Sequence, residues 1–145
     1  MNRRMIINAV GLVLRVEAVL LLLPAIVAVI YGERQTWLAF LISAAISLAL
    51  GLLPKLFLKP RNHVIYAKEG FIIVAFTWIM LSLVGAVPLV LSSAVASYAD
   101  AFFEIVSGFT TTGASVIPDV EALTHGVLFW RSFTHWVGGM GIIVF

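Results

Sequence analysis

The sequence predicts an all-α membrane protein, in which two N-terminal transmembrane helices precede one helix–pore-loop–helix repeat. The composition is the first indication, because 62% of the 145 residues are hydrophobic and only 11% are charged. A soluble domain carries about 25% charged residues. The second indication is that the apolar residues form blocks of about twenty, enough for a helix to cross a hydrocarbon core of ~30 Å. The third is a short, more polar stretch between two of these blocks.

Four transmembrane spans account for the apolar blocks. They are expected at about Met5–Ile30, at Trp37–Leu53 with an end at Pro54, at Phe71–Leu91, and from Ala122 to Phe145. All are read as helices, because these blocks are far longer than barrel strands of ~10 residues.

A cleavable signal peptide is the alternative for the N-terminus, but that apolar run is too long and contains Arg15 and Glu17. Since the last block is still apolar at Phe145, we expect the N-terminal part of a longer protein. A natural four-helix protein is the alternative.

The stretch between the third and fourth spans is predicted to be a re-entrant pore loop. Tyr98–Gly108 reads as a helix of ~16 Å at 1.5 Å per residue, about half the hydrocarbon core. Asp100 is the expected N-cap of this helix. Thr110–Ser115 disfavours helix, because three β-branched threonines run into a glycine. Non-helical backbone is tolerated at membrane depth only where it is buried in protein or lines a watery path.

The carbonyl oxygens of Thr110, Thr111, Thr112 and Gly113 are the candidate metal ligands, and potassium is the expected ion. Hard oxygen donors can replace the hydration shell of an alkali cation. Gly113 can adopt a positive φ, which lets successive carbonyls face one way. The carbonyl end of the preceding short helix carries partial negative charge, which also favours a cation. An ordinary extracellular turn is the alternative for this segment.

Arg131 lies about halfway along the fourth span, where a guanidinium normally faces a cavity or a partner. It either lines the cation pathway or holds the bundle together, with Glu104 on the short helix as a candidate partner. His125 and His135 are interpreted as packed or interfacial histidines, because their spacing of ten residues fits no metal motif. Arg15 and Glu17 are two residues apart and do not face each other on a helix.

The basic residues indicate the orientation. They concentrate at the N-terminus and between the second and third spans: Arg3, Arg4, Lys55, Lys59, Arg61 and Lys68. The opposite side has Arg34 with several acidic residues. The positive-inside rule therefore places the N-terminus in the cytoplasm, so that the pore loop is reached from outside.

Other functional classes have little support. The chain has no cysteine, and no serine, histidine and carboxylate set is brought together by the sequence, so we expect neither an enzyme nor a cofactor. No basic tract with interleaved aromatics indicates nucleic-acid binding.

Several motifs together resemble the first pore repeat of the bacterial Trk-type potassium uptake proteins, in the Trk/Ktr/HKT superfamily. The motifs are Phe-Phe-Glu at 102–104, Ser-Gly-Phe-Thr-Thr-Thr-Gly-Ala at 107–114, Phe-Trp-Arg at 129–131, Trp-Val-Gly-Gly-Met-Gly-Ile-Ile at 136–143, Lys-Glu-Gly-Phe at 68–71 and Gly-Ala-Val-Pro at 85–88. The resemblance implies four such repeats around one pore, each with a filter strand centred on a glycine, here Gly113. A glycine there leans toward potassium.

The resemblance also implies the organisation and partners of the protein. Residues 1–67 would be the two additional N-terminal helices of the Trk branch, and residues 68–145 the first repeat, truncated in its last helix. It implies a multi-pass protein of the bacterial inner membrane, in contact with lipid, that forms homodimers and binds a cytoplasmic nucleotide-binding regulatory subunit. Two alternatives stay open: a secondary carrier with a helix broken at Thr110–Gly113, and a four-helix membrane scaffold.

Overall fold

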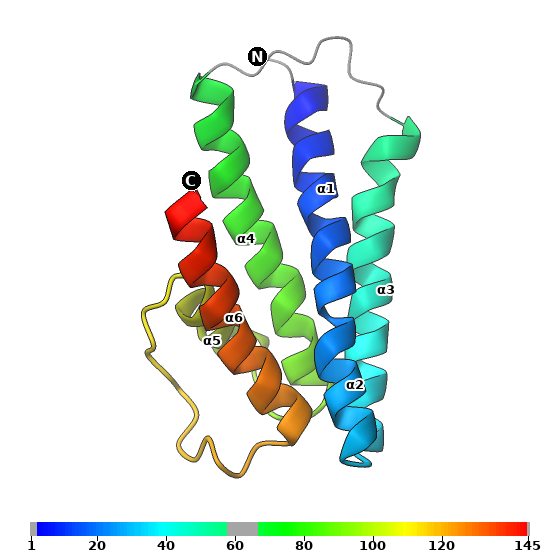
Figure 1. The fold of residues 1–145 in the computed structure, drawn as a ribbon, viewed down its shortest axis with the longest axis vertical. Helices are drawn as coiled ribbons and strands as arrows, with labels where there is room; N and C mark the ends of the chain where they lie inside the picture. Colours follow the sequence, from blue (N-terminus) through cyan, green and yellow to red (C-terminus); the bar gives the residue numbers. More distant parts are fainter. Residues whose placement is uncertain (1–2, 58–66, 145) are drawn as a thin grey trace.

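The computed structural model describes residues 3–57 and 67–144, and every regular element in this part of the chain is helical (Figure 1). The six helices are α1 (Arg3–Leu20), α2 (Leu22–Ile30), α3 (Arg34–Phe57), α4 (Ala67–Leu91), α5 (Tyr98–Phe109) and α6 (His125–Val144). The predicted all-α class is therefore confirmed. The predicted basic residues Lys59 and Arg61 lie outside the described residues.

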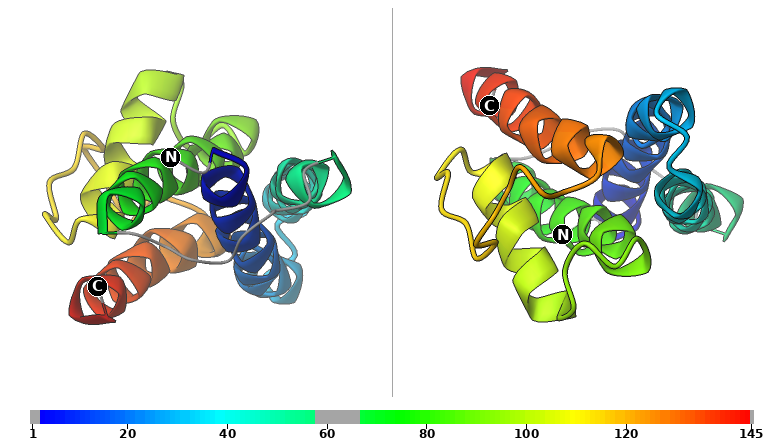
Figure 2. Two further views of the ribbon diagram at one scale, coloured as in Figure 1. Left: turned by 90° about the horizontal axis from the view of Figure 1, so that it is seen from above. Right: turned by 90° about the horizontal axis from the view of Figure 1, so that it is seen from below.

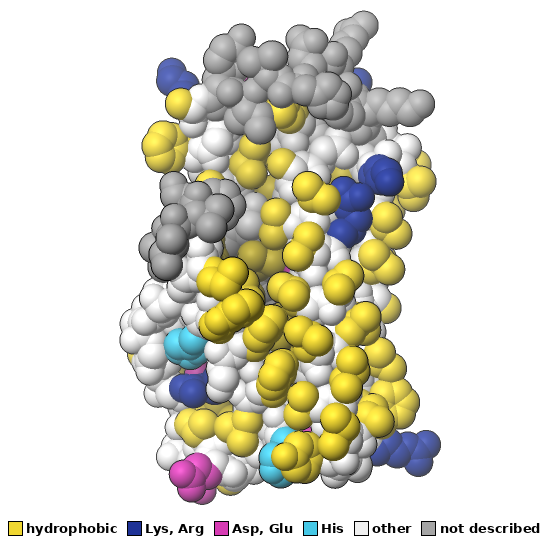
Figure 3. Space-filling model, in the orientation of Figure 1, with side chains coloured by type: hydrophobic (Ala, Val, Ile, Leu, Met, Phe, Trp, Pro, Cys, Tyr) yellow, Lys and Arg dark blue, Asp and Glu magenta, His cyan; other side chains and the backbone are white. Residues whose placement is uncertain are grey.

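Three stretches of the described chain are long and apolar enough to cross a membrane: 3–30, formed by α1 and α2 together, then α3 and α4. Figure 3 shows hydrophobic side chains along much of the length of one face of the bundle. Many large hydrophobic side chains of the bundle are exposed. Examples are Leu12, Val19 and Phe71, with 55%, 63% and 79% of their surface exposed. The protein is thus a multi-pass membrane protein. The predicted fourth span corresponds to α6, which has 20 residues but is not among the three stretches that qualify by composition.

Prolines bear on the first two predicted spans. The first predicted span is present as one stretch, residues 3–30, in which a single turn residue, Leu21, stands between α1 and α2. Pro24 has no N–H to donate to the carbonyl of Leu20, so one hydrogen bond of the helical ladder is missing there, while the Leu21 N–H still donates to the Glu17 carbonyl at 2.8 Å. The predicted end of the second span at Pro54 was wrong, because α3 continues through this proline to Phe57. Prolines are tolerated within transmembrane helices where neighbouring groups satisfy the freed carbonyl.

The helices pack around one core. α1 lies between α3 and α4, α2 continues along α3 and reaches α6, and α5 packs against both α4 and α6 (Figure 2). The backbones of α1 and α3 touch at two glycines, since a Cβ on Gly51 would lie only 2.7 Å from the carbonyl oxygen of Gly11. Large buried side chains of the core include Leu14, Leu21, Phe40, Leu89, Ile105, Phe109, Val127 and Trp130.

The chain between α4 and α6 leaves one end of the bundle and returns to it. Gln35 at the start of α3 donates a hydrogen bond to the Ser93 hydroxyl just after α4. Glu33, before α3, contacts His125 at the start of α6. In Figure 1, α5 and the following loop (yellow to orange) rise from this end of the bundle and turn back partway along the length of α4. The chain between α4 and α6 therefore starts and ends at the same end of the bundle.

Candidate functional site

The short helix α5 sets the depth of the candidate site. Its 12 residues span about 18 Å, well short of a hydrocarbon core of ~30 Å. The predicted N-cap, Asp100, was wrong: the N-cap is Ser97, in extended conformation and without a side-chain capping bond. The Ser97 carbonyl already accepts the N–H of Ala101 at 3.0 Å, so Asp100 lies within the first turn. Its carboxylate still complements the positive end of the helix dipole there.

The backbone after α5 folds back on the last turn of the helix. The N–H groups of Thr110, Thr111 and Thr112 donate to the carbonyls of Val106, Gly108 and Ser107, each at 2.9 Å, and the Gly113 N–H reaches the Ser107 carbonyl at 3.4 Å. These four N–H groups are thus used inside the protein. Among the hydrogen bonds between described residues, none ends on a carbonyl oxygen of residues 110–113. Within the described part of the chain, these carbonyls therefore accept no hydrogen bond.

Two residues of this segment have left-handed backbone: Thr111 with φ 57° and Gly113 with φ 76°. Glycine adopts this conformation without cost, whereas a β-branched threonine rarely does and is strained. A Cβ on Gly113 would meet no atom within 4 Å, so the backbone angle, and not lack of space, requires glycine. All four residues from Thr110 to Gly113 are exposed in this chain.

Hydroxyl groups fix the shape of the turn. The hydroxyl oxygens of Thr110 and Thr112 lie 2.8 Å apart, and the Ser107 hydroxyl donates to the carbonyl of Ala114 at 2.6 Å. Thr110 can also donate to the Val106 carbonyl at 2.7 Å. These bonds tie the segment to α5 through its side chains as well as its backbone.

Glu104 connects three parts of the site. Its side chain is buried, and one carboxylate oxygen accepts the Val116 N–H at 3.0 Å and also the Ser115 hydroxyl. The other oxygen lies 3.3 Å from Nε of Arg131 on α6. The structure therefore brings Glu104 and Arg131 together. Their pair joins three segments: α5, the chain that follows Gly113 (residues 114–117), and α6.

The extended segment of residues 114–117 runs back along α5, in the opposite direction to the helix. Ala114 lies beside Ser107, and Val116 lies beside Glu104. The chain after Gly113 therefore moves back toward the end from which α5 began. Asp100, near that end, takes no part in the Glu104 and Arg131 contacts.

Glycines let α6 approach the carbonyl end of α5. A Cβ on Gly138 would collide with the backbone of Phe109, lying 2.7 Å from its carbonyl carbon. A Cβ on Gly108 would collide with the Thr134 side chain. Gly138, in the glycine-rich stretch 138–141, is therefore where α6 comes into contact with the backbone at the end of α5.

A second polar contact holds the start of α6, and no sequence pattern predicted it beyond the presence of an acidic residue before a span. Glu33 accepts the backbone N–H groups of His125 and Gly126 at 2.6 and 3.0 Å, and lies 2.9 Å from the His125 ring nitrogen. The His125 ring stacks on Tyr31, with centroids 3.8 Å apart. Burial acts to raise the pKa of the Glu33 carboxyl, but the hydrogen bonds from Gly126 and His125 outweigh it and hold the pKa below its ordinary value.

Of the other ionisable residues of the spans, Arg15 and Glu17 take no part in the contacts of the candidate site, whereas His135 lies beside Arg131. Arg15 donates from Nε to the Gly11 carbonyl at 3.2 Å and Glu17 accepts from the Ser47 hydroxyl at 3.2 Å. The two do not pair, as their spacing predicts. His135 lies 2.8 Å through Nδ1 from the Arg131 carbonyl. Within residues 3–57 and 67–141, no group of three His, Asp or Glu side chains could hold a metal ion.

The family model for the TrkH cation transport proteins matches residues 37–145. The chain belongs to the TrkH family. An uncharacterised cation transporter of Methanocaldococcus jannaschii is 40% identical over 139 residues, which cover 96% of this chain and 29% of the relative. The Trk system potassium uptake protein TrkH of Halomonas elongata is 36% identical over 145 residues, with 99% and 30% covered.

The TrkH-family fold is also found in a solved structure. The crystal structure of the potassium transporter TrkH from Vibrio parahaemolyticus matches with a TM-score of 0.92 at 37% identity, over 99% of this chain and 31% of that one. The chain thus spans about 30% of the length of the curated relatives that it matches.

Proposed function

We propose that this chain contributes one pore repeat, residues 68–145, to a potassium uptake protein of the bacterial cytoplasmic membrane. The observation that carries the proposal is the end of α5. This half-length helix stops inside the bundle, and the next four N–H groups turn back onto it. The carbonyls of Thr110–Gly113 keep no partner among the described residues and form the strand that binds the ion.

The chemistry of this strand suits an alkali cation. Carbonyl oxygens replace the hydration shell, and the carbonyl end of α5 adds a partial negative charge without a carboxylate. Glu104 and Arg131 neutralise each other 3.3 Å apart, so their role is to hold the strand against α5 and α6. The left-handed angles of Thr111 and Gly113 keep the turn in the shape that frees the carbonyls.

The return of the chain favours a pore over a carrier with a broken helix. In a discontinuous transmembrane helix, a second half-helix follows the break and completes the crossing. Here the chain after Gly113 runs back along α5, with Val116 bound to Glu104. A pore loop that enters and leaves on one side has this path. The named relatives are transporters, which argues against an enzyme and against a scaffold.

The remaining assignments rest on charge and resemblance. The cluster of Arg3, Arg4, Lys55 and Lys68 at one end of the bundle supports a cytoplasmic N-terminus by the positive-inside rule. The helices α1 and α2 brace the repeat, since α1 packs on α4 and α2 on α6. Homodimers and a cytoplasmic nucleotide-binding regulatory subunit are the partners that we propose.

Potassium and sodium uptake tests the proposal, in cells that lack their own potassium importers and express the natural protein carrying this sequence. Gly113→Ser should leave the protein in the membrane but weaken its preference for potassium over sodium, because a Cβ opposes the positive φ. Thr112→Ser is the matched control and keeps both the hydroxyl and the carbonyl, so its uptake should change much less. Wild-type uptake and selectivity in Gly113→Ser would show that residues 110–113 are an ordinary loop.

A further inference from the structure

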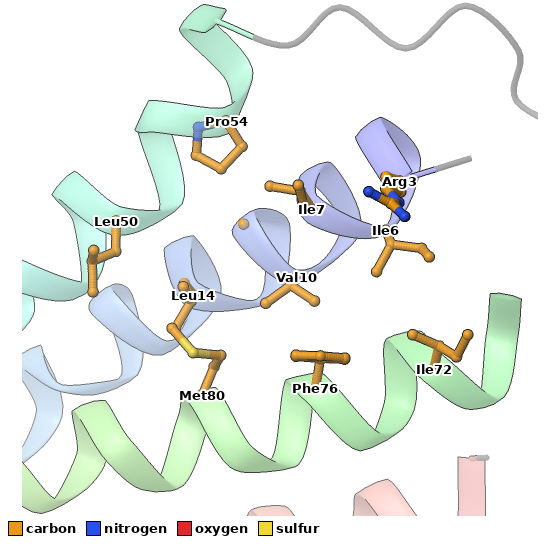
Figure 4. A pocket seen from close by; sticks show the side chains of 11 residues that line it. Arg3, Ile6, Ile7, Val10, Leu14, Leu50, Pro54, Ile72, Phe76 and Met80 are labelled. Carbon is orange, nitrogen blue, oxygen red and sulfur yellow. The ribbon is translucent and has the colours of Figure 1, made fainter. Parts of the chain in front are cut away.

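A hollow of about 530 Å³ lies between α1, α3 and α4, away from the loop after α5 (Figure 4). It is at the end of the bundle where α1 and α4 begin and α3 ends. Its volume falls within the ~300–1,000 Å³ of typical ligand pockets. Nothing in the proposed ion pathway uses it.

The walls of the hollow are hydrocarbon. In Figure 4, Val10 and Leu14 of α1 face Phe76 and Met80 of α4. Ile7 and Phe76 line the hollow and are still 44% and 54% exposed, so no described part of the chain covers them. An aqueous solute would find no polar partner along these walls.

The depth of the hollow matches one leaflet of a bilayer. The lining residues of α1 run along one face from Arg3 to Leu14, a rise of about 16 Å. This is about half of a ~30 Å hydrocarbon core. A single acyl chain that enters from the nearer membrane surface would extend over that distance.

A positive charge stands at the mouth of the hollow. Arg3 is the charged residue among the described residues that line it, and Figure 4 shows it beyond Ile6 and Ile7 at the outer end of the α1 wall. Lys68, the second residue of α4, lies at the same end of the bundle. Basic residues at a membrane surface attract anionic lipid headgroups.

We propose that this hollow binds one acyl chain of an anionic phospholipid, with the lipid phosphate beside the Arg3 guanidinium. The apolar walls, their depth of one leaflet and the cation at the mouth fit the two parts of such a molecule. The site is separate from the proposed ion-binding strand, so either proposal can fail without the other.

Photolabelling tests the lipid site. The natural protein is reconstituted in vesicles of phosphatidylcholine that contain a trace of phosphatidylglycerol or of phosphatidylcholine with a photoactivatable group in one acyl chain. Labelled peptides are identified by mass spectrometry. We expect the phosphatidylglycerol probe to label residues 6–14 and 72–80 more than the phosphatidylcholine probe does.

Two pairs of variants make the test specific. Arg3→Gln should lower labelling by the anionic probe about fivefold, the effect expected for one basic residue near an anionic lipid surface, while Arg4→Gln should not. Ile7→Trp, which fills the hollow, should suppress labelling, whereas Leu12→Trp, on an exposed face of α1 outside the hollow, should not. Equal labelling by both probes with no effect of Arg3→Gln would overturn the proposal, and so would absence of label from the hollow.

Discussion

Replacing Glu104 by glutamine tests whether one carboxylate holds the loop in place. Glutamine keeps an oxygen for Ser115 and Val116, but its NH₂ group would face the Arg131 guanidinium, which can only donate. The two bonds to the loop lose their charge assistance, worth about 1 kcal/mol each. Removing one partner of a buried ion pair costs about 3–5 kcal/mol, and the low end applies because the Arg131 side chain is 18% exposed. We expect a total of about 5 kcal/mol.

The assay is thermal unfolding of the natural protein in detergent. After heating to each temperature, the fraction of protein that remains folded is measured by size-exclusion chromatography. Asp100→Asn is the matched control, because it makes the same change on the same helix at an exposed position, where the helix dipole is worth only about 0.3–1 kcal/mol. Glu104→Gln should lower the midpoint temperature clearly, and Asp100→Asn only slightly. Equal midpoints for the two variants would refute the conclusion that Glu104 anchors the loop.

Three further predictions follow from other contacts. Gly138→Ala should destabilise the protein by about 1–3 kcal/mol through overpacking against α5; the same midpoint as Gly139→Ala, whose Cβ would have its nearest atom at 3.8 Å, would contradict this. A cysteine at Lys68 should be protected from membrane-impermeant thiol reagents in intact cells and one at Ala96 labelled; the reverse pattern would invert the topology. Glu33 has a lowered pKa in the fold, so its stabilisation is present above its unfolded pKa of about 4.5 and is lost as pH falls through the lower folded value. Glu33→Gln should flatten this acid loss in thermal unfolding, and an unchanged profile would refute the Glu33 contact.

The helices were predictable because, in a membrane, the composition and length of an apolar block largely determine its secondary structure. Every apolar block became a helix, since lipid offers the backbone no other partner. The boundaries were less accurate. The first span was predicted at nearly its observed length, with one turn residue inside it, whereas α3 continues three residues beyond the predicted end at Pro54. Hydropathy does not show how far a helix extends past a proline, because that depends on what packs beside the freed carbonyl.

The short helix and the turn after it were predictable, and the contacts that hold them were less so. The helix at 98–109 and the left-handed glycine at 113 follow local patterns, so both could be predicted from the sequence. The N-cap was misplaced by one turn, because Ser97 and Asp100 are both residues that favour this position. The contact of Glu33 with the start of α6 joins residues 92 positions apart, and no local pattern indicates such a pairing. The Glu104 and Arg131 pair could be suggested because two buried opposite charges in adjacent helices need partners.

The most direct test of the central claim is to locate the ion. The structure of the natural protein should be determined in thallium(I) or rubidium in place of potassium, with the ion identified by its anomalous scattering. The account predicts a peak coordinated by the carbonyl oxygens of Thr110–Gly113. Ion density at other positions in the protein, with none at these carbonyls, would contradict it.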